Sequence, residues 1–354
     1  MVQLSAEQQH ARSLIVDFIE NQNSPYFVLN GLAGTGKTTV LADIGREYGL
    51  PMCSFTGKAA SVLHGKTGLL ATTIHEAIYY CEQIRDGDQV HLNFTDKYEP
   101  GELFGKVTLL DECSMVNRSI ANDMLRTGMW IIAGGDPGQL PPVFGDPFFT
   151  QADFTLTEPH RQALESPIIR QAYQVRNGNH YQTDGDGFQV LSSLPRAQLL
   201  EADTVIVYTN RTRRDLTIMI RDLHGYGRKY PQAGEPVMCL KNAKDYGLYN
   251  GAIYTLLKTF DPEDHCIHLE VDGEPIEVPY VEFECIPSQV PDHVLEATTR
   301  FDFGYVITCH KAQGSEWKDI IIVDEYPLWQ QDRARWLYTA ITRAAERVRI
   351  LPSF

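Results

Sequence analysis

Short apolar runs alternate with stretches of helical hydrophobic spacing over most of the chain. The strand-like runs lie at 26–29, 52–55, 107–110, 129–133, 205–208, 320–323 and 348–351. The helical stretches lie at 37–48, 57–63, 118–127, 211–223 and 332–345. Strands that alternate with helices are typical of a parallel sheet flanked by helices, because parallel strands need long crossover connections. The pattern therefore predicts an α/β fold.

Two segments interrupt this alternation. Between 236 and 286 the apolar period falls to two, and it does so on both sides of Asp272-Gly273, a pair typical of hairpin turns. A shorter interruption at 81–105 contains a second turn signal, Asp86-Gly87. We therefore predict a small all-β module inserted into the α/β fold, and a separate β-hairpin.

Composition narrows the class of protein. The chain has 354 residues, of which 43% are hydrophobic and 22% charged, which suits about two or three globular domains and excludes a disordered or collagen-like chain. Its apolar runs are strand-sized, and the first ten residues lack the pattern of a secretion signal. The seven cysteines are widely spaced and suggest neither a disulfide framework nor a CxxC zinc site. We expect a soluble, cytoplasmic protein with no membrane contact.

The net charge of -15 would by itself disfavour a polyanionic partner. The acid is unevenly distributed, however. Residues 225–296 carry thirteen acidic and five basic side chains, a net of -8, which leaves -7 on the other 282 residues. The charge therefore disfavours nucleic-acid binding mainly by the predicted all-β module.

The strongest chemical signal is the segment 31–38, which fits the pattern G-x-x-x-x-G-K-[ST] and follows an apolar strand. In such a loop the glycines let backbone N–H groups surround phosphates, the lysine reaches the outer phosphates and the hydroxyl can hold Mg²⁺. The alternative is a glycine-rich turn with a solvated lysine, which the flanking strand and helix disfavour. The expected nucleotide-binding residues are Gly34, Thr35, Gly36, Lys37, Thr38 and Thr39.

An acidic pair, Asp111 and Glu112, follows the apolar run 107–110. In P-loop ATPases a carboxylate at this position completes the Mg²⁺ shell, and its neighbour can polarise the attacking water. We therefore predict Thr38 and Asp111 as metal ligands and Glu112 as the catalytic base. Alternatively, the two acids could simply open the next helix, where acidic residues are favoured.

Further motifs follow in an order known from one family. They lie at 4–8 (Q motif), 56–60 (Ia), 72–75 (Ic), 111–115 (II), 135–142 (III), 160–162 (IV), 308–316 (V) and 338–344 (VI). With the P-loop they span residues 4–344, nearly the whole chain. In this order the chain resembles the superfamily 1 helicases, specifically the compact phage-type members of the 5′-to-3′ branch that includes the RecD-like and Dda-like helicases.

The resemblance implies two RecA-like P-loop lobes with ATP between them. Residues 1–155 would form the first lobe, with 81–105 as the pin that separates strands. The second lobe would comprise 156–224 and 297–354. The segment 225–296 would be an SH3-like insertion, in agreement with the period-two pattern found there.

The resemblance also assigns roles around the nucleotide. Gln8 would contact the adenine edge, Gln139 would sense the γ-phosphate and Glu316 would contact the ribose. Arg161 and Arg343 would be cationic fingers from the second lobe, stabilising charge on the transferring phosphoryl group. Without its flanking motif, Arg343 would be one of several arginines on a C-terminal helix.

Strand contacts are expected from both lobes. They would come from Thr56, Lys58, Thr73 and His75 in the first lobe, and from Asn210, Arg211, Thr308 and His310 in the second. Hydroxyls, amides and a few cations suit phosphate contacts that position a strand without selecting its sequence. Aromatic side chains at 79–80, 144 and 148–149 could stack on bases or fill a core.

The expected function is ATP-dependent 5′-to-3′ translocation on single-stranded DNA with separation of duplex DNA, in replication, recombination or repair. The implied partners are single-stranded and forked DNA, with replication or recombination proteins possible at the acidic 225–296, and the protein would act as a monomer in the cytosol of a bacterium or a phage-infected host. Two alternatives remain open: a translocase that displaces proteins or remodels DNA joints with little unwinding, and a non-enzymatic ATP-binding switch.

Overall fold

The structure of the protein is a computed structural model. It describes residues 4–352 except 87–88, 97–106, 160–164, 228–229, 244–245, 262, 265, 272, 280, 284–298 and 329. The chain divides into two compact units. The first contains Met1–Tyr80, Phe94–Gly187 and Leu328–Thr342, and the second contains Cys81–Asn93, Phe188–Pro327 and Arg343–Phe354.

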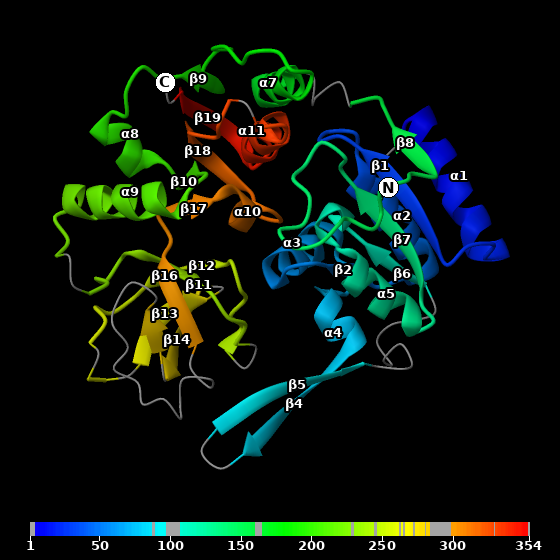
Figure 1. Ribbon diagram of the computed structural model, residues 1–354, viewed down its shortest axis with the longest axis horizontal. Helices are drawn as coiled ribbons and strands as arrows, with labels where there is room; N and C mark the ends of the chain where they lie inside the picture. Colours follow the sequence, from blue (N-terminus) through cyan, green and yellow to red (C-terminus); the bar gives the residue numbers. More distant parts are fainter. Residues whose placement is uncertain are drawn as a thin grey trace. The chain divides into compact units, whose positions relative to one another are not determined.

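The described strands of the first unit form a parallel sheet in the order β3-β2-β6-β7-β1-β8 (Figure 1). Their bounds are β1 Tyr26–Gly31, β2 Met52–Ser54, β3 Ala71–Thr73, β6 Val107–Leu110, β7 Trp130–Gly135 and β8 Phe154–Leu156. The central strands are apolar along almost their whole length and buried, as expected when helices cover both faces of a parallel sheet.

Two apolar clusters pack on opposite faces of this sheet. Val28 belongs to one cluster and its neighbour Leu29 to the other, and successive side chains of a strand point to opposite faces. The surrounding helices are α1 Ala6–Asn21, α2 Lys37–Tyr48, α3 Gly57–Thr67, α4 Ile74–Ile78, α5 Arg118–Arg126, α7 Pro167–Arg176 and α11 Arg333–Ile341. Helices α7 and α11, which the resemblance placed in the second lobe, group with this first unit.

A second parallel sheet lies in the second unit, in the order β17-β10-β18-β19-β9. Its strands are β9 Phe188–Val190, β10 Thr204–Val207, β17 Val306–Thr308, β18 Trp317–Asp324 and β19 Ala344–Pro352. The accompanying helices are α8 Arg196–Glu201, α9 Asn210–Leu223 and α10 Cys309–Ala312. Two parallel sheets with helices confirm the predicted α/β fold.

The second unit also holds a mixed sheet in the order β14-β13-β12-β11-β16-β15. Its strands are β11 Pro236–Cys239, β12 Ile253–Leu256, β13 Cys266–Val271, β14 Glu274–Pro279, β15 Val281–Phe283 and β16 Thr299–Phe303. Strands β13 and β14 pair antiparallel, with Val271 opposite Glu274, so the hairpin expected from the period of two is confirmed. The sheet also takes in β16, which lies beyond residue 296.

Helix α9 is joined to this mixed sheet by two buried ion pairs. Arg213 pairs with Asp302 of β16, and both side chains are buried. Eight residues later, Arg221 Nε lies 2.7 Å from Glu235 Oε1, and its guanidinium carbon lies 4.1 Å from the centre of the Phe303 ring. A buried ion is tolerated only when it is paired, so these contacts fix α9 against the sheet.

Strands β4 Tyr79–Asp86 and β5 Gln89–Asp96 form a two-stranded sheet. This confirms a hairpin in the segment that follows residue 80, although Gly87 of the predicted turn and the part beyond residue 96 lie outside the described residues. In the described part of the chain, none of the helices has the length and apolar character needed to cross a bilayer.

The prediction of a helix over 332–345 is wrong at its C-terminal end. Helix α11 stops at Ile341, and β19 begins at Ala344. The Trp317 amide donates to the Arg343 carbonyl oxygen at 2.9 Å, and Trp317 is the strand partner of Ala344. Pairing with β18 therefore takes these residues into the sheet, an effect that local hydrophobic spacing does not reveal.

Candidate nucleotide-binding site and nucleic-acid contacts

The P-loop connects β1 to α2 in the first unit. Gly34 and Gly36 have φ angles of 82° and 80°, in the left-handed region that glycine adopts without strain. Gly31 is also sterically required, because a Cβ there would lie 2.5 Å from Thr35 Oγ1. The loop is therefore tightly wound, and α2 begins directly at Lys37.

Lys37 folds back onto this loop. Its Nζ donates hydrogen bonds to the carbonyl oxygens of Gly31 at 2.6 Å and Leu32 at 3.1 Å. The ammonium group is thus held at the loop itself, where the P-loop pattern places the outer phosphates of a nucleotide.

Thr38 and Asp111 meet although they are 73 positions apart. Thr38 Oγ1 donates to Asp111 Oδ2 at 2.8 Å, and the Glu112 amide donates to Asp111 Oδ1 at 2.9 Å. The contact arises because the strands that precede them, β1 and β6, both pair with β7 and end at the same edge of the sheet. Glu112 has a φ of 57°, a left-handed conformation that is uncommon outside glycine and is found at functional sites.

These residues fit a nucleoside triphosphate with Mg²⁺. Successive backbone N–H groups around left-handed glycines form an anion-binding concavity. A hydroxyl and a carboxylate in contact supply the oxygen ligands that Mg²⁺ prefers. Thr35 and Thr39 lie in the loop and in the first turn of α2, so the predicted nucleotide-binding residues of the P-loop form one continuous group.

Gln8 is buried at the start of α1. Its side-chain oxygen accepts from the Ser5 amide at 3.0 Å, in a capping box that begins the helix. Its Nε2 donates to the Thr35 carbonyl oxygen at 3.0 Å. The predicted Q motif is thereby attached to the P-loop.

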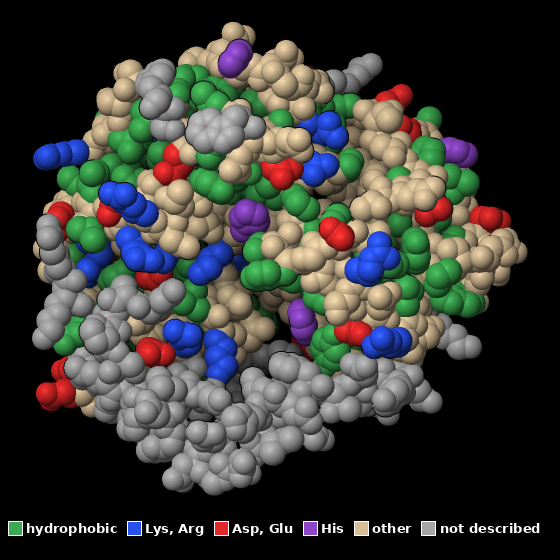
Figure 2. Space-filling view, in the orientation of Figure 1, with side chains coloured by type: hydrophobic (Ala, Val, Ile, Leu, Met, Phe, Trp, Pro, Cys, Tyr) green, Lys and Arg blue, Asp and Glu red, His purple; other side chains and the backbone are tan. Residues whose placement is uncertain are grey.

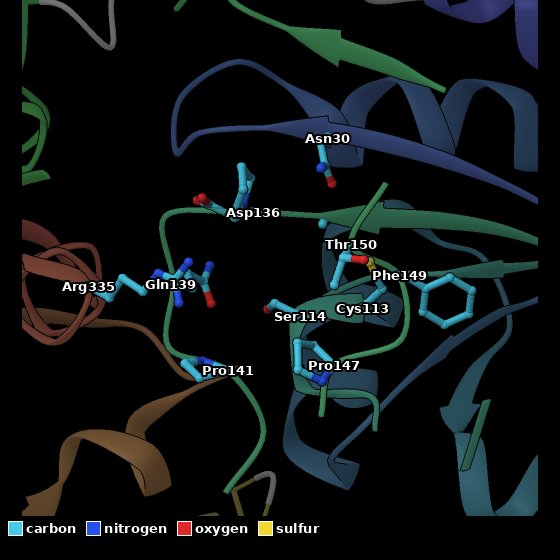
Figure 3. Close-up of a pocket in the computed structure, with 12 residues that line it drawn as sticks. Asn30, Cys113, Ser114, Asp136, Gln139, Pro141, Pro147, Phe149, Thr150 and Arg335 are labelled. Carbon is cyan, nitrogen blue, oxygen red and sulfur yellow. The ribbon is translucent and has the colours of Figure 1, made fainter. Parts of the chain in front are cut away.

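The loop after β7 carries Gln139, which is buried. Asp136 organises this loop, since its Oδ1 accepts from the Gly138 amide at 2.8 Å. Beside it is a small pocket of about 140 Å³. Figure 3 shows Gln139 and Arg335 extending into the pocket from one side and Ser114 from the other. The Ser114 hydroxyl is buried there without a hydrogen-bond partner among the described residues.

Three other nucleotide contacts were predicted from the sequence. Arg343 and Glu316 belong to the second unit. There the Arg343 side chain is buried and its Nη1 lies 3.5 Å from the Ser315 carbonyl oxygen, whereas Glu316 is exposed. Arg161 lies outside the described residues.

The predicted DNA contacts of the first unit lie at one edge of its sheet. Strands β2 and β3 are neighbours, with Ser54 opposite Thr73. The Oγ1 atoms of Thr56 and Thr73 accept from the first turns of α3 and α4, each at 3.2 Å. Lys58 and His75 lie in those turns, so all four residues follow adjacent parallel strands.

Burial reduces the charge of this group. It lowers the pKa of Lys58 to about 8 and moves the pKa of His75 below its ordinary value. His75 is therefore largely neutral at pH 7, and its ring centre lies 6.0 Å from that of Phe55. A contact through His75 would rely on hydrogen bonding or stacking, since a neutral imidazole offers no charge.

The second unit repeats this arrangement. Strands β10 and β17 are neighbours, with Val207 opposite Thr308. Asn210 begins α9, and His310 lies in α10, which follows β17. Desolvation lowers the pKa of His310, as it does for His75. The four predicted contacts here are Asn210, Arg211, Thr308 and His310.

Basic side chains mark the surface near α9. The Arg211 side chain is 91% exposed, and its Nε lies 3.9 Å from Oδ2 of Asp215, whose side chain is 70% exposed. Figure 2 shows Lys and Arg side chains gathered over the region of α9. Within α9, however, Arg213 and Arg221 are buried in ion pairs and Arg211 lies beside Asp215, so acidic partners offset much of this charge.

The aromatic candidates separate into two kinds. Phe148 and Phe149 pack against each other and against Tyr26, and belong to the core. Phe144 is 80% exposed, and its carbonyl oxygen accepts from Asn117 Nδ2 at 3.1 Å. The structure describes no side chain for Tyr80. Phe144 is thus the one of these three phenylalanines that remains available for stacking on a base.

Three residues at the site were missed by the sequence analysis: Asp136, Tyr173 and Tyr338. Tyr338 lies within motif VI and Asp136 within motif III, so each was close to a predicted residue. Tyr173 has no distinguishing pattern around it. Their roles depend on contacts between distant parts of the chain, which spacing alone does not show.

The fold and the P-loop together define a P-loop nucleotide-binding protein. Two family models match the chain: the AAA domain over residues 3–191 and the UvrD-like helicase C-terminal domain over residues 303–351. Since the first covers more than half of the chain, the chain belongs to the AAA-domain family.

Individual proteins are similar to this chain over most of its length. The ATP-dependent RecD2 DNA helicase of Deinococcus radiodurans is 27% identical over 355 residues, which cover 90% of this chain and 46% of RecD2. Bacteroides Pif1 bound to single-stranded DNA has a TM-score of 0.64 at 20% identity, covering 99% of this chain and 92% of Pif1. Candida albicans Pif1 has a TM-score of 0.55 at 17% identity, covering 99% and 95%. The chain spans less than half the length of the curated relatives it matches.

Proposed function

We propose that this protein hydrolyses ATP to move along single-stranded DNA in the 5′-to-3′ direction and to separate duplex DNA. The observation that carries the proposal is the repeated arrangement of polar side chains. In each unit two adjacent parallel β-strands end in a group of residues that are predicted to contact DNA. The first unit also holds the P-loop. Two separate DNA-binding groups and one nucleotide site are what a protein requires to move stepwise along a DNA strand.

The chemistry of hydrolysis would be distributed as follows. Lys37 and the P-loop amides bind the phosphates, Thr38 and Asp111 hold the metal, and Glu112 accepts a proton from the attacking water. When bound, Mg²⁺ would neutralise charge on the phosphate oxygens. Gln139, Arg161 and Arg343 would complete the site from outside the P-loop, and Gln8 and Glu316 would contact the base and the ribose.

Closure around ATP and reopening after hydrolysis would move one lobe relative to the other, so that their grips on the strand alternate. We retain 1–155 as the first lobe and 156–224 with 297–354 as the second. The hairpin β4–β5 would serve as the pin, and 225–296 as the SH3-like insertion. Its acidic surface would suit a protein partner better than DNA, and the active form would be a monomer.

Strand-displacement assays test both activity and polarity. With ATP and Mg²⁺, we expect a duplex with a 5′ single-stranded tail to be unwound, and a duplex with only a 3′ tail to remain intact. A blunt duplex and a reaction without ATP are the controls. Unwinding from 3′ tails alone would contradict the polarity. DNA-stimulated ATP hydrolysis without strand displacement would favour a translocase that remodels joints, and failure to hydrolyse ATP would favour a switch.

A further inference from the structure

Two tyrosines bind the two polar groups of a single P-loop residue. The Tyr338 hydroxyl of α11 accepts from the Ala33 amide at 2.6 Å, and the Tyr173 hydroxyl of α7 donates to the Ala33 carbonyl oxygen at 2.7 Å. All three residues belong to the first unit. The main chain of Ala33 is thus held at both its N–H and its carbonyl group by helices that lie far away in sequence.

The Tyr338 hydroxyl extends this contact to the loop that carries Gln139. Its single proton is donated to Asp136 Oδ2 at 2.7 Å, while the other oxygen of Asp136 accepts from the Gly138 amide. The next residue, Thr339, accepts from the Leu140 amide at 2.9 Å. One turn of α11 therefore contacts the P-loop and the residues that precede and follow Gln139 in its loop, Asp136 and Leu140.

The packing leaves little freedom in this network. Tyr338 is fully buried, and a Cβ on Gly138 would lie 2.8 Å from its ring. Burial and the nearby Asp136 carboxylate raise the pKa of Tyr338 well above its ordinary value and that of Tyr173 to about 12. Both phenols therefore stay protonated at working pH, so these hydrogen bonds do not depend on pH.

We infer that Tyr338 and Tyr173 are positioning residues that hold the Ala33 peptide and set the P-loop in register with the loop of Gln139. Helix α11 is followed directly by Thr342 and Arg343, so the same helix connects the P-loop to the proposed arginine finger. The kinetic consequence rests on the proposed function, whereas the hydrogen bonds at Ala33 do not depend on it.

Tyr338→Phe tests the inference, because it removes the hydroxyl and keeps the ring that fills the core. Hydrogen exchange should show the Ala33 amide exchanging at least about tenfold faster than in the wild type, since its acceptor is lost. With saturating single-stranded DNA, kcat for ATP hydrolysis should fall about tenfold, with KM for ATP changed less than about threefold. Tyr173→Phe should lower kcat in the same direction, and the double variant should lose less than the product of the two single effects.

The matched control is Tyr48→Phe, on the exposed end of α2 in the same unit, which should leave both measurements unchanged. Unaltered exchange at Ala33 in Tyr338→Phe would overturn the inference, as would a fall in kcat that only follows a lowered unfolding temperature. Absence of ATP hydrolysis in the wild type would instead remove the proposed function and leave the exchange result valid.

A second, independent observation concerns the mixed sheet. Cys266, His268 and Glu277 lie on the paired strands β13 and β14, with His268 directly opposite Glu277. One ligand atom from each lies within 4.8 Å of the others. Cys266 Sγ is 3.8 Å from His268 Nε2, whereas Glu277 Oε2 lies 3.8 Å from the other ring nitrogen, Nδ1. Two ligands of a tetrahedral Zn²⁺ at about 2.3 Å (S) and about 2.0 Å (N) from the metal are separated by roughly 3.6 Å.

We propose that these three side chains form a site for a late first-row divalent cation such as Zn²⁺, with water as a further ligand. A thiolate, an imidazole and a carboxylate are the donor set that such ions favour over Mg²⁺. The exposed Glu277 can adjust its side chain to reach the ion. The sequence analysis did not find this site because one ligand comes from the neighbouring strand.

Titration of the metal-free 354-residue protein with Co²⁺ tests the site. We expect one equivalent to give a thiolate-to-cobalt charge-transfer band that Zn²⁺ abolishes by displacement. The band should be lost in Cys266→Ser. In His268→Ala the apparent affinity for Co²⁺ should fall at least about tenfold. The exposed His180→Ala variant, which lies in the first unit, should behave as the wild type. Absence of the band, or its persistence in Cys266→Ser, would overturn the proposal.

Discussion

Replacement of Lys37 by alanine is expected to abolish ATP hydrolysis and DNA unwinding while leaving the protein folded. The Lys37 ammonium is held at the P-loop by the carbonyl oxygens of Gly31 and Leu32, where it would neutralise charge on the outer phosphates. Its stem contributes little to either apolar cluster, so stability should change by less than about 1 kcal/mol. Phosphate release measured with saturating single-stranded DNA, together with thermal unfolding, gives both quantities.

Lys318→Ala is the matched control, because Lys318 is a surface lysine of the second unit whose side chain is 76% exposed. It should retain wild-type turnover. A folded Lys37→Ala protein with normal turnover would remove the P-loop from the mechanism. A protein that no longer unfolds cooperatively would show that Lys37 has a structural role.

Glu112→Gln should retain ATP binding and lose hydrolysis. Glutamine keeps the shape of the side chain but cannot accept a proton, and a positioned general base contributes about 10²–10⁴-fold to a rate. The bonds from Thr38 and from the Glu112 amide to Asp111 do not involve the Glu112 side chain, so the metal ligands should remain in place. We expect kcat to fall by about 10³-fold, with nucleotide affinity within about threefold of the wild type.

Fluorescent-nucleotide binding and single-turnover hydrolysis separate these two effects. Glu20→Gln, on the exposed last turn of α1, provides the same chemical change away from the site and should have no effect. Near-normal turnover in Glu112→Gln would assign proton transfer to another group. A collapse of nucleotide affinity would instead make Glu112 a binding residue.

The parts of the site that the sequence specifies are those built from neighbouring residues. The P-loop and the bounds of α2 follow from local patterns, because glycine conformations and helix starts are decided within a few positions. The pairing of Thr38 with Asp111 was also predictable, since both follow apolar strands of a parallel sheet. The structure places them in contact through strands that share β7.

Other features depend on contacts that no local pattern contains. Ala33 and Tyr338 are 305 positions apart, and the end of α11 is set by the pairing of Trp317 with Ala344. The charge states of Lys58, His75 and His310 depend on burial. The fold lowers the pKa of all three side chains, an effect that the sequence alone does not reveal.

The buried pairs Arg213–Asp302 and Arg221–Glu235 limit how this protein could be rearranged by gene fusion. A deletion of 225–296 removes both Glu235 and the Tyr230 carbonyl oxygen, the groups that Arg221 contacts from this segment. It also leaves β16 without its neighbour β11. An exchange of this module between relatives would therefore succeed only if α9 and β16 were exchanged with it. The segment that must be transferred as one piece is larger than the insertion itself.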